Sequence, residues 1–111
     1  MWVFLNDSFI SVVGTGFHEK LLVRGRLPGD IERVFPKAEV QETPDRDYRF
    51  RTFVTREEMA GALYNAVFAI DYPNFKGSVA DPDRHDAYLD VWDAMLDAQQ
   101  RKLGMAKTTG R

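Results

Sequence analysis

The chain has 111 residues, no cysteine and a formal net charge of −2. This length fits one domain, and the share of hydrophobic residues (44%) and charged residues (29%) is typical of a folded globular chain. The composition excludes a disulfide scaffold, a coiled coil and Cys-ligated zinc. No apolar run approaches the roughly 20 residues that span a bilayer, and residues 1–7 carry no basic leader. We therefore expect a cytoplasmic protein with no membrane partner.

The first half of the chain predicts an antiparallel sheet. Residues 2–5 and 9–13 are rich in aromatic and β-branched residues, and a turn-forming Asn-Asp-Ser segment separates them, which is typical of a β-hairpin. Residues 20–26 and 48–54 alternate as further strands, and residues 38–43 form a weak strand at an edge. A short helix is predicted over residues 30–35, where Pro36 ends it.

Two longer helices are predicted in the second half. Thr55 and Glu58 have the spacing of a capping box, which starts a helix that runs to about Ile70. Asp81 followed by Pro82 starts another helix, which runs to about Leu103. The inner stripe of the first of these helices is expected to comprise Met59, Leu63, Ala66, Val67 and Ile70.

These elements predict an α+β fold, with an antiparallel sheet of about five strands and two long C-terminal helices packed on one face. The prediction places one α+β domain over residues 1–103 and a flexible tail over residues 104–111. The strand alternation assigns to the other sheet face Trp2, Phe4, Arg24, Arg26, Arg49 and Arg51.

Several segments carry a resemblance to known sequences. They are MWVFLND (1–7), PGDIERVFP (28–36), YRFR (48–51), IDYPNFK (70–76), and RHDAY (84–88) with VW (91–92). With these segments the chain resembles a family of small uncharacterised bacterial proteins. The resemblance covers most of the chain except the tail. It implies a single domain and assigns no role to any residue.

Acidic residues recur along the last predicted helix. Residues 81–97 carry six Asp against Arg84 alone. A helix with spacings of 3, 4, 3 and 4 places on one stripe Asp83, Asp86, Asp90, Asp93 and Asp97. One interpretation is a solvated helix face, and the other is a docking surface for a basic partner.

The arginines of the sheet offer a second surface. Arg24 and Arg26 on one strand and Arg49 and Arg51 on another are expected side by side, interleaved with aromatic residues. Arginine with aromatic residues on a sheet can hold single-stranded nucleic acid. The alternative is cross-strand pairing of these arginines with acidic residues such as Glu39 and Glu42.

Two further groups of residues are candidate sites. Tyr72, Phe75 and Lys76 lie in a loop, where they either pack under the helices or form a contact site. The one cluster with acid/base or metal-ligand chemistry comprises Asp71, Asp83, His85 and Asp86. It matches no established metal pattern, so we expect neither a metal nor a cofactor.

No catalytic motif stands out in the sequence. The first hypothesis is therefore a non-enzymatic domain, regulatory or inhibitory, that docks on a partner protein or on itself through the acidic helix face. The alternative is a nucleic-acid-binding protein that uses the arginine and aromatic sheet face. A second alternative is a small enzyme or metal protein around His85.

Overall fold

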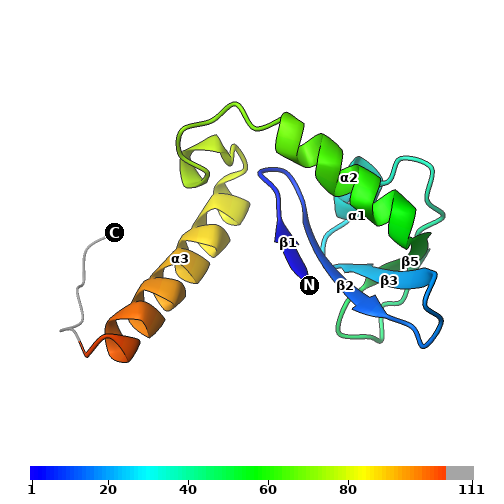
Figure 1. The fold of residues 1–111 in the computed structure, drawn as a ribbon, viewed down its shortest axis with the longest axis horizontal. Coiled ribbons are helices and arrows are strands. Elements are labelled where there is room, and N and C mark those ends of the chain that lie inside the picture. Colours follow the sequence, from blue (N-terminus) through cyan, green and yellow to red (C-terminus); the bar gives the residue numbers. More distant parts are fainter. Residues whose placement is uncertain (105–111) are drawn as a thin grey trace. The chain divides into compact units, whose positions relative to one another are not determined.

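The structure, a computed structural model, describes residues 1–104 (Figure 1). The described part of the expected tail is therefore Gly104 alone, and residues 105–111 lie outside the described residues. The chain divides into two compact units, Met1–Asp71 and Tyr72–Arg111. Its elements are β1 (Trp2–Phe4), β2 (Phe9–Gly14), β3 (Lys20–Gly25), α1 (Asp30–Val34), β4 (Gln41–Glu42), β5 (Phe50–Thr55), α2 (Arg56–Phe68), η1 (Lys76–Ser78) and α3 (Pro82–Lys102).

The first unit contains a five-stranded antiparallel sheet with the strand order β1-β2-β3-β5-β4. This confirms the predicted α+β class and the sheet. The weak edge strand expected over residues 38–43 is reduced to the two residues of β4. The predicted packing of two long helices on one sheet face is not shown, because α3 belongs to the second unit.

One face of the sheet forms the hydrophobic core. Register pairs Val12 with Val23, and Leu21 with Val54, so their side chains point to the same side. Helices α1 and α2 cover this side with Ile31 and Met59. The buried cluster comprises Ile10, Val12, Val23, Ile31, Phe35, Val54 and Met59.

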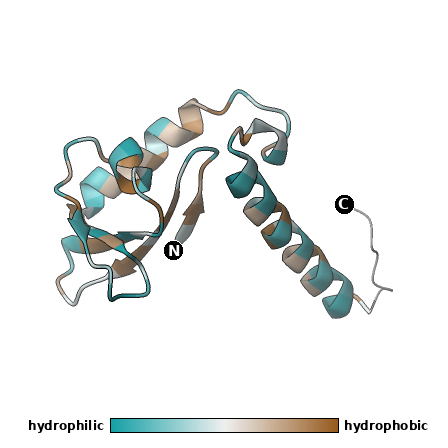
Figure 2. Cartoon of the chain, turned by 180° about the vertical axis from the view of Figure 1, so that it is seen from behind, coloured by the Kyte–Doolittle hydropathy of each residue, from teal (hydrophilic) through white to brown (hydrophobic). Residues whose placement is uncertain are grey.

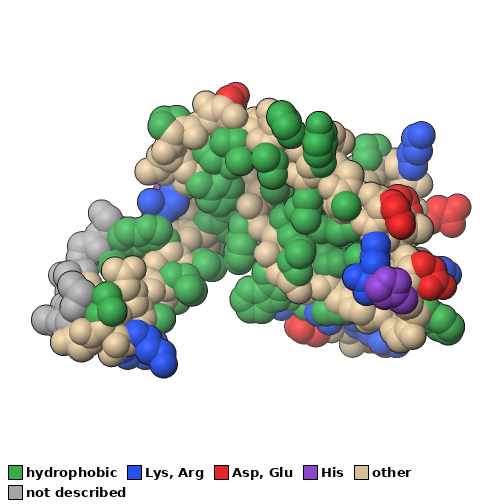
Figure 3. Space-filling view, in the orientation of Figure 1, with side chains coloured by type: hydrophobic (Ala, Val, Ile, Leu, Met, Phe, Trp, Pro, Cys, Tyr) green, Lys and Arg blue, Asp and Glu red, His purple; other side chains and the backbone are tan. Residues whose placement is uncertain are grey.

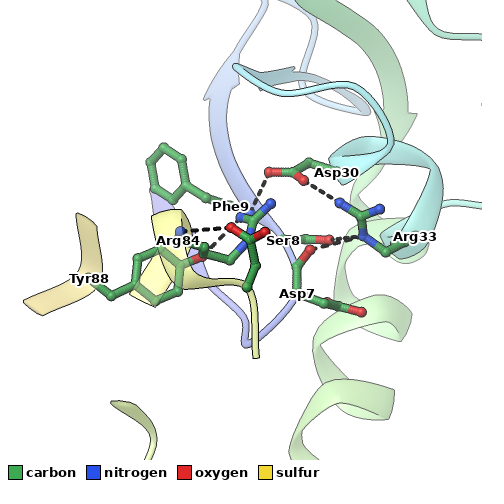
Figure 4. Close-up of polar contacts among 8 residues, drawn as sticks. Asp7, Ser8, Phe9, Asp30, Arg33, Arg84 and Tyr88 are labelled. Carbon is green, nitrogen blue, oxygen red and sulfur yellow. Dashed lines mark hydrogen bonds and ion pairs between the residues drawn. The ribbon is translucent and has the colours of Figure 1, made fainter. Parts of the chain in front are cut away.

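An ion pair between the buried Asp30 and the partly exposed Arg33 connects α1 to the turn between β1 and β2 (Figure 4). The side chain of Asp30 is almost fully buried, forms an ion pair with Arg33, and accepts a hydrogen bond of 3.0 Å from the Phe9 amide. Arg33 Nε donates to the Asp7 carbonyl (2.9 Å) and to Ser8 Oγ (3.1 Å). We call this group, Asp30 with Arg33, the clasp.

The start of α1 requires a glycine. Gly29 has a φ of 90°, which lies in the left-handed region that side chains disfavour. A Cβ at this position would also lie 2.7 Å from Nη1 of Arg33, the arginine of the clasp. The Pro-Gly-Asp sequence at residues 28–30 therefore suits both the turn and the ion pair that follows.

Helix α2 starts as predicted and ends earlier. Both hydrogen bonds of the capping box are present, from the Glu58 amide to Thr55 Oγ1 (3.0 Å) and from the Thr55 amide to Glu58 Oε1 (2.9 Å). The expectation that Val67 and Ile70 continue the inner stripe is wrong, because both side chains are exposed. The core of the first unit includes α2 residues only as far as Leu63.

Changing Thr55 to Ala is expected to lower the free energy of unfolding by about 1 kcal/mol, since the Glu58 amide loses its hydrogen-bond acceptor. Urea denaturation followed by circular dichroism measures the difference. Thr55→Ser is the matched control, because serine keeps the hydroxyl. Equal losses in both variants would contradict a role for the cap.

The second unit is built on α3. Asp81 caps the helix by accepting a hydrogen bond of 2.8 Å from the Arg84 amide, and Pro82 occupies the first helical position, as predicted. Among the residues that the structure describes, no helix combines the length and the apolar character needed to cross a membrane.

Candidate functional site

The candidate site is the sheet face opposite the core of the first unit, which we call the open face. Strand alternation brings to it side chains from four strands, because residues on either side of each core position point the opposite way. No acidic residue belongs to this set of described strand residues. The open face takes from these strands Trp2, Phe4, Phe9, Ser11, Val13, Lys20, Leu22, Arg24, Arg51, Phe53 and Thr55, and Gln41 of β4 lies opposite Arg51.

Aromatic rings form the apolar part of the open face. The Phe9 ring contacts Phe4, with a centroid distance of 4.7 Å, and Trp2 edge-on at 6.2 Å. Trp2 is 67% exposed and Phe53 is 59% exposed, although both lie on short, ordered strands. The ammonium group of Lys20 lies 5.9 Å from the Phe53 ring centroid. Exposed aromatic residues next to cations are typical of interaction surfaces.

Two arginines lie opposite each other at the centre of the open face. Arg24 of β3 is in register with Arg51 of β5, and like charges in such a pair destabilise a sheet. Arg24 is held in place, because its Nη2 donates to Ser11 Oγ (2.9 Å) and its guanidinium lies 4.4 Å from the Tyr48 ring centroid. We call Arg24 and Arg51 the arginine pair.

The arginine pair has hydrogen-bonding capacity that the protein does not use. The Nε atoms of Arg24 and Arg51 are both buried and have no hydrogen-bond partner among the described residues. A buried donor without an acceptor costs roughly 1–3 kcal/mol. The two side chains are half-buried, and an anion in contact with their exposed atoms would offset the repulsion between the two charges.

The other two predicted arginines are already paired with carboxylates. Arg26 forms an ion pair of 3.2 Å with Asp47 and lies over the Tyr48 ring at 4.1 Å. The hydrogen bond that Arg26 donates to Asp47 raises the pKa of the guanidinium above its ordinary value. Arg49 forms an ion pair of 2.7 Å with Glu42. The structure thus brings together Arg24 and Arg51, while Arg26 and Arg49 take the alternative of pairing with acidic residues.

Sequence reasoning missed the residues that position Arg24. Tyr48 precedes β5, and the guanidinium groups of both Arg24 and Arg26 lie against its ring. Ser11 was not predicted to contact Arg24, although strand alternation places the two residues on the same face. Predicting the contact between Ser11 and Arg24 requires the register between β2 and β3, which the sequence alone does not give.

The five predicted acidic residues all lie on α3, in the second unit. Asp83 is in the first turn, where a carboxylate suits the positive helix N-terminus. Asp90, Asp93 and Asp97 each have an interaction partner. The acidic helix face is therefore in part engaged within the protein, which favours the interpretation of a structural role for those three.

The predicted loop residues pack within the second unit. The Phe75 ring stacks on Tyr88 with a centroid distance of 5.7 Å, and Tyr72 contacts Phe75 at the same distance. The Lys76 ammonium lies 4.9 Å from the Trp92 ring centroid. These contacts favour packing over a contact site for the loop.

In the cluster expected around His85, the imidazole and the neighbouring carboxylate do not form a hydrogen bond. His85 Nδ1 lies 3.8 Å from Asp86 Oδ1, which exceeds hydrogen-bond distance. Asp83 lies on the same helix, whereas Asp71 belongs to the first unit. Within residues 1–104 no group of three or more His, Cys, Asp or Glu could hold a metal ion.

Comparisons with protein-family models, with curated proteins and with solved structures found no match. The geometry of the open face is therefore the basis on which a function can be proposed.

Proposed function

We propose that the protein is a non-enzymatic binding domain that docks on an acidic segment of a partner protein through the open face. The observation that carries the proposal is the arginine pair, because two like charges lie opposite each other on a sheet face whose described strand residues include no acid. A carboxylate side chain of the partner would accept hydrogen bonds from the pair. The exposed rings of Trp2 and Phe53 would pack against apolar residues beside that carboxylate.

The chemistry of the open face favours a protein over a nucleic acid. Most of its side chains are apolar or aromatic, which suits a protein interface. A nucleic-acid strand needs several cations along its backbone, but Arg26 and Arg49 are paired with Asp47 and Glu42. Arg24 is partly engaged as well, through Ser11.

Single-stranded nucleic acid is the second candidate ligand. The observation that favours it is the absence of acidic residues from the described strands of the open face, together with the exposed Trp2 and Phe53 rings. Such rings can stack on bases. A labelled oligonucleotide titrated at low salt tests this candidate, and an absence of binding would remove it.

Changing both Arg24 and Arg51 to Gln is expected to weaken partner binding by about tenfold or more, because the carboxylate loses two charged donors. The experiment is a tagged pull-down, with and without nuclease, followed by calorimetry on the purified partner. Arg49→Gln is the matched control, since Arg49 lies away from the pair on Glu42. Affinity that falls equally in the control would contradict the proposal.

Two further variants separate the alternatives. Changing Asp90, Asp93 and Asp97 to Lys tests the acidic helix face. If only this variant loses partner binding, the interface lies on α3 and not on the open face. His85→Ala tests the enzyme alternative. A partner that is lost on nuclease treatment would favour the nucleic-acid candidate.

A further inference from the structure

The C-terminal half of α2 carries no charge, and Asn65 is its one polar side chain. No charged residue occurs from Met59 to Ile70. Figure 2 shows the helix changing from hydrophilic colours at its start to pale and hydrophobic colours toward its end, and hydrophobic side chains follow α2 in Figure 3. We call four exposed side chains here the α2 patch: Tyr64 (64% exposed), Val67 (61%), Phe68 (75%) and Ile70 (54%).

The α2 patch has two parts. Tyr64 and Phe68 are one helical turn apart and their rings are in contact, with centroids 4.7 Å apart. Val67 lies on the side of the helix that Met59 and Leu63 bury in the core, and Ile70 follows two residues after the helix ends. A group of large exposed apolar side chains is typical of an interaction surface, so the α2 patch is expected to be covered.

We infer that a second copy of the chain covers the α2 patch, with the two α2 helices packed antiparallel about a two-fold axis. An interface between identical surfaces must be compatible with itself, and a patch without charges brings no like-charge repulsion to such a contact. The antiparallel arrangement also places opposite ends of the helix dipoles together.

The available area agrees with a weak dimer. The four side chains expose on the order of 500 Å² per copy, since large aromatic residues present 150–250 Å² each. Twice this area, roughly 1,000 Å² in total, is near the lower limit for a specific interface. The inference does not rest on the proposed function, because the α2 patch shares no residue with the open face.

Sedimentation velocity of the purified full chain over a range of concentrations measures the dimer. Changing Tyr64 and Phe68 to Lys is expected to raise the dimer dissociation constant by about tenfold or more. Both side chains are largely exposed, so circular dichroism should show an unchanged fold. Trp2→Lys with Phe53→Lys is the matched control, since it places the same two charges on exposed rings of the open face. A monomer at every concentration, or a dimer that only the control dissociates, would overturn the inference.

A cross-link provides a second test. The chain has no cysteine, so one introduced thiol is unique. Val67→Cys is expected to form a disulfide-linked dimer under mild oxidation, because the two copies of this position approach each other across the axis. Glu57→Cys, in the first turn of the same helix, should link much more slowly. Equal rates for the two variants would contradict the antiparallel contact.

Discussion

Changing Asp30 to Ala is expected to lower the free energy of unfolding by about 3 kcal/mol. The Asp30 carboxylate is 1% exposed and is the acceptor for both the Phe9 amide and the Arg33 guanidinium. Its removal leaves a buried amide without a partner and takes away the charge that Arg33 faces. Because the Arg33 side chain is 42% exposed, water compensates part of the loss, so the effect lies at the low end for a buried pair. Urea denaturation measures it.

Two comparisons isolate the clasp. Asp7→Ala removes a neighbouring exposed carboxylate but keeps the backbone carbonyl that Arg33 Nε contacts, so stability should stay within about 0.5 kcal/mol. Arg33→Met removes the other partner, and the double variant with Asp30→Ala should cost less than the two single changes added together. Additive losses would show that the two side chains do not stabilise each other.

The parts of the fold that the sequence predicts well depend on local signals. The capping box of Thr55 and Glu58 and the Asp81-Pro82 start of α3 each involve residues within one helical turn. The hairpin of β1 and β2 follows from two apolar segments with a turn between them. Such features depend on residues that are close together in the chain, so the sequence alone is enough to predict them.

The parts that the sequence does not predict depend on distant contacts. Asp30 looks like an ordinary residue at a helix start, and its burial depends on the β1–β2 turn, about 20 residues earlier. The apolar spacing of α2 predicts a stripe through Ile70, but spacing cannot show that the core includes its residues only as far as Leu63. Tyr48 follows the alternation of β5 in sequence but lies before the strand begins.

The candidate site also has a part that the sequence predicts and a part that it does not. Alternation alone places Arg24 and Arg51 on one face, and the strand order makes them neighbours. The pairing of Arg26 with Asp47 depends on the loop before β5, and the pairing of Arg49 with Glu42 depends on the two-residue strand β4. The sequence therefore predicts four equivalent arginines, whereas two of them are distinguished by unused donors.

Changing Ile31 to Ala is expected to destabilise the first unit by about 3 kcal/mol. Ile31 is fully buried in the core cluster, and its Cγ1 lies where a Cβ on Gly25 of β3 would come within 3.1 Å. This close approach of α1 to the sheet leaves a cavity when the side chain is shortened. Ile31→Val is the control and should cost about 1 kcal/mol, since it removes one methylene group. Trp2 fluorescence in a Trp92→Phe background reports unfolding of the first unit during urea denaturation. Equal losses in the two variants, or a loss under 1 kcal/mol for Ala, would contradict the expected packing of α1 on the sheet.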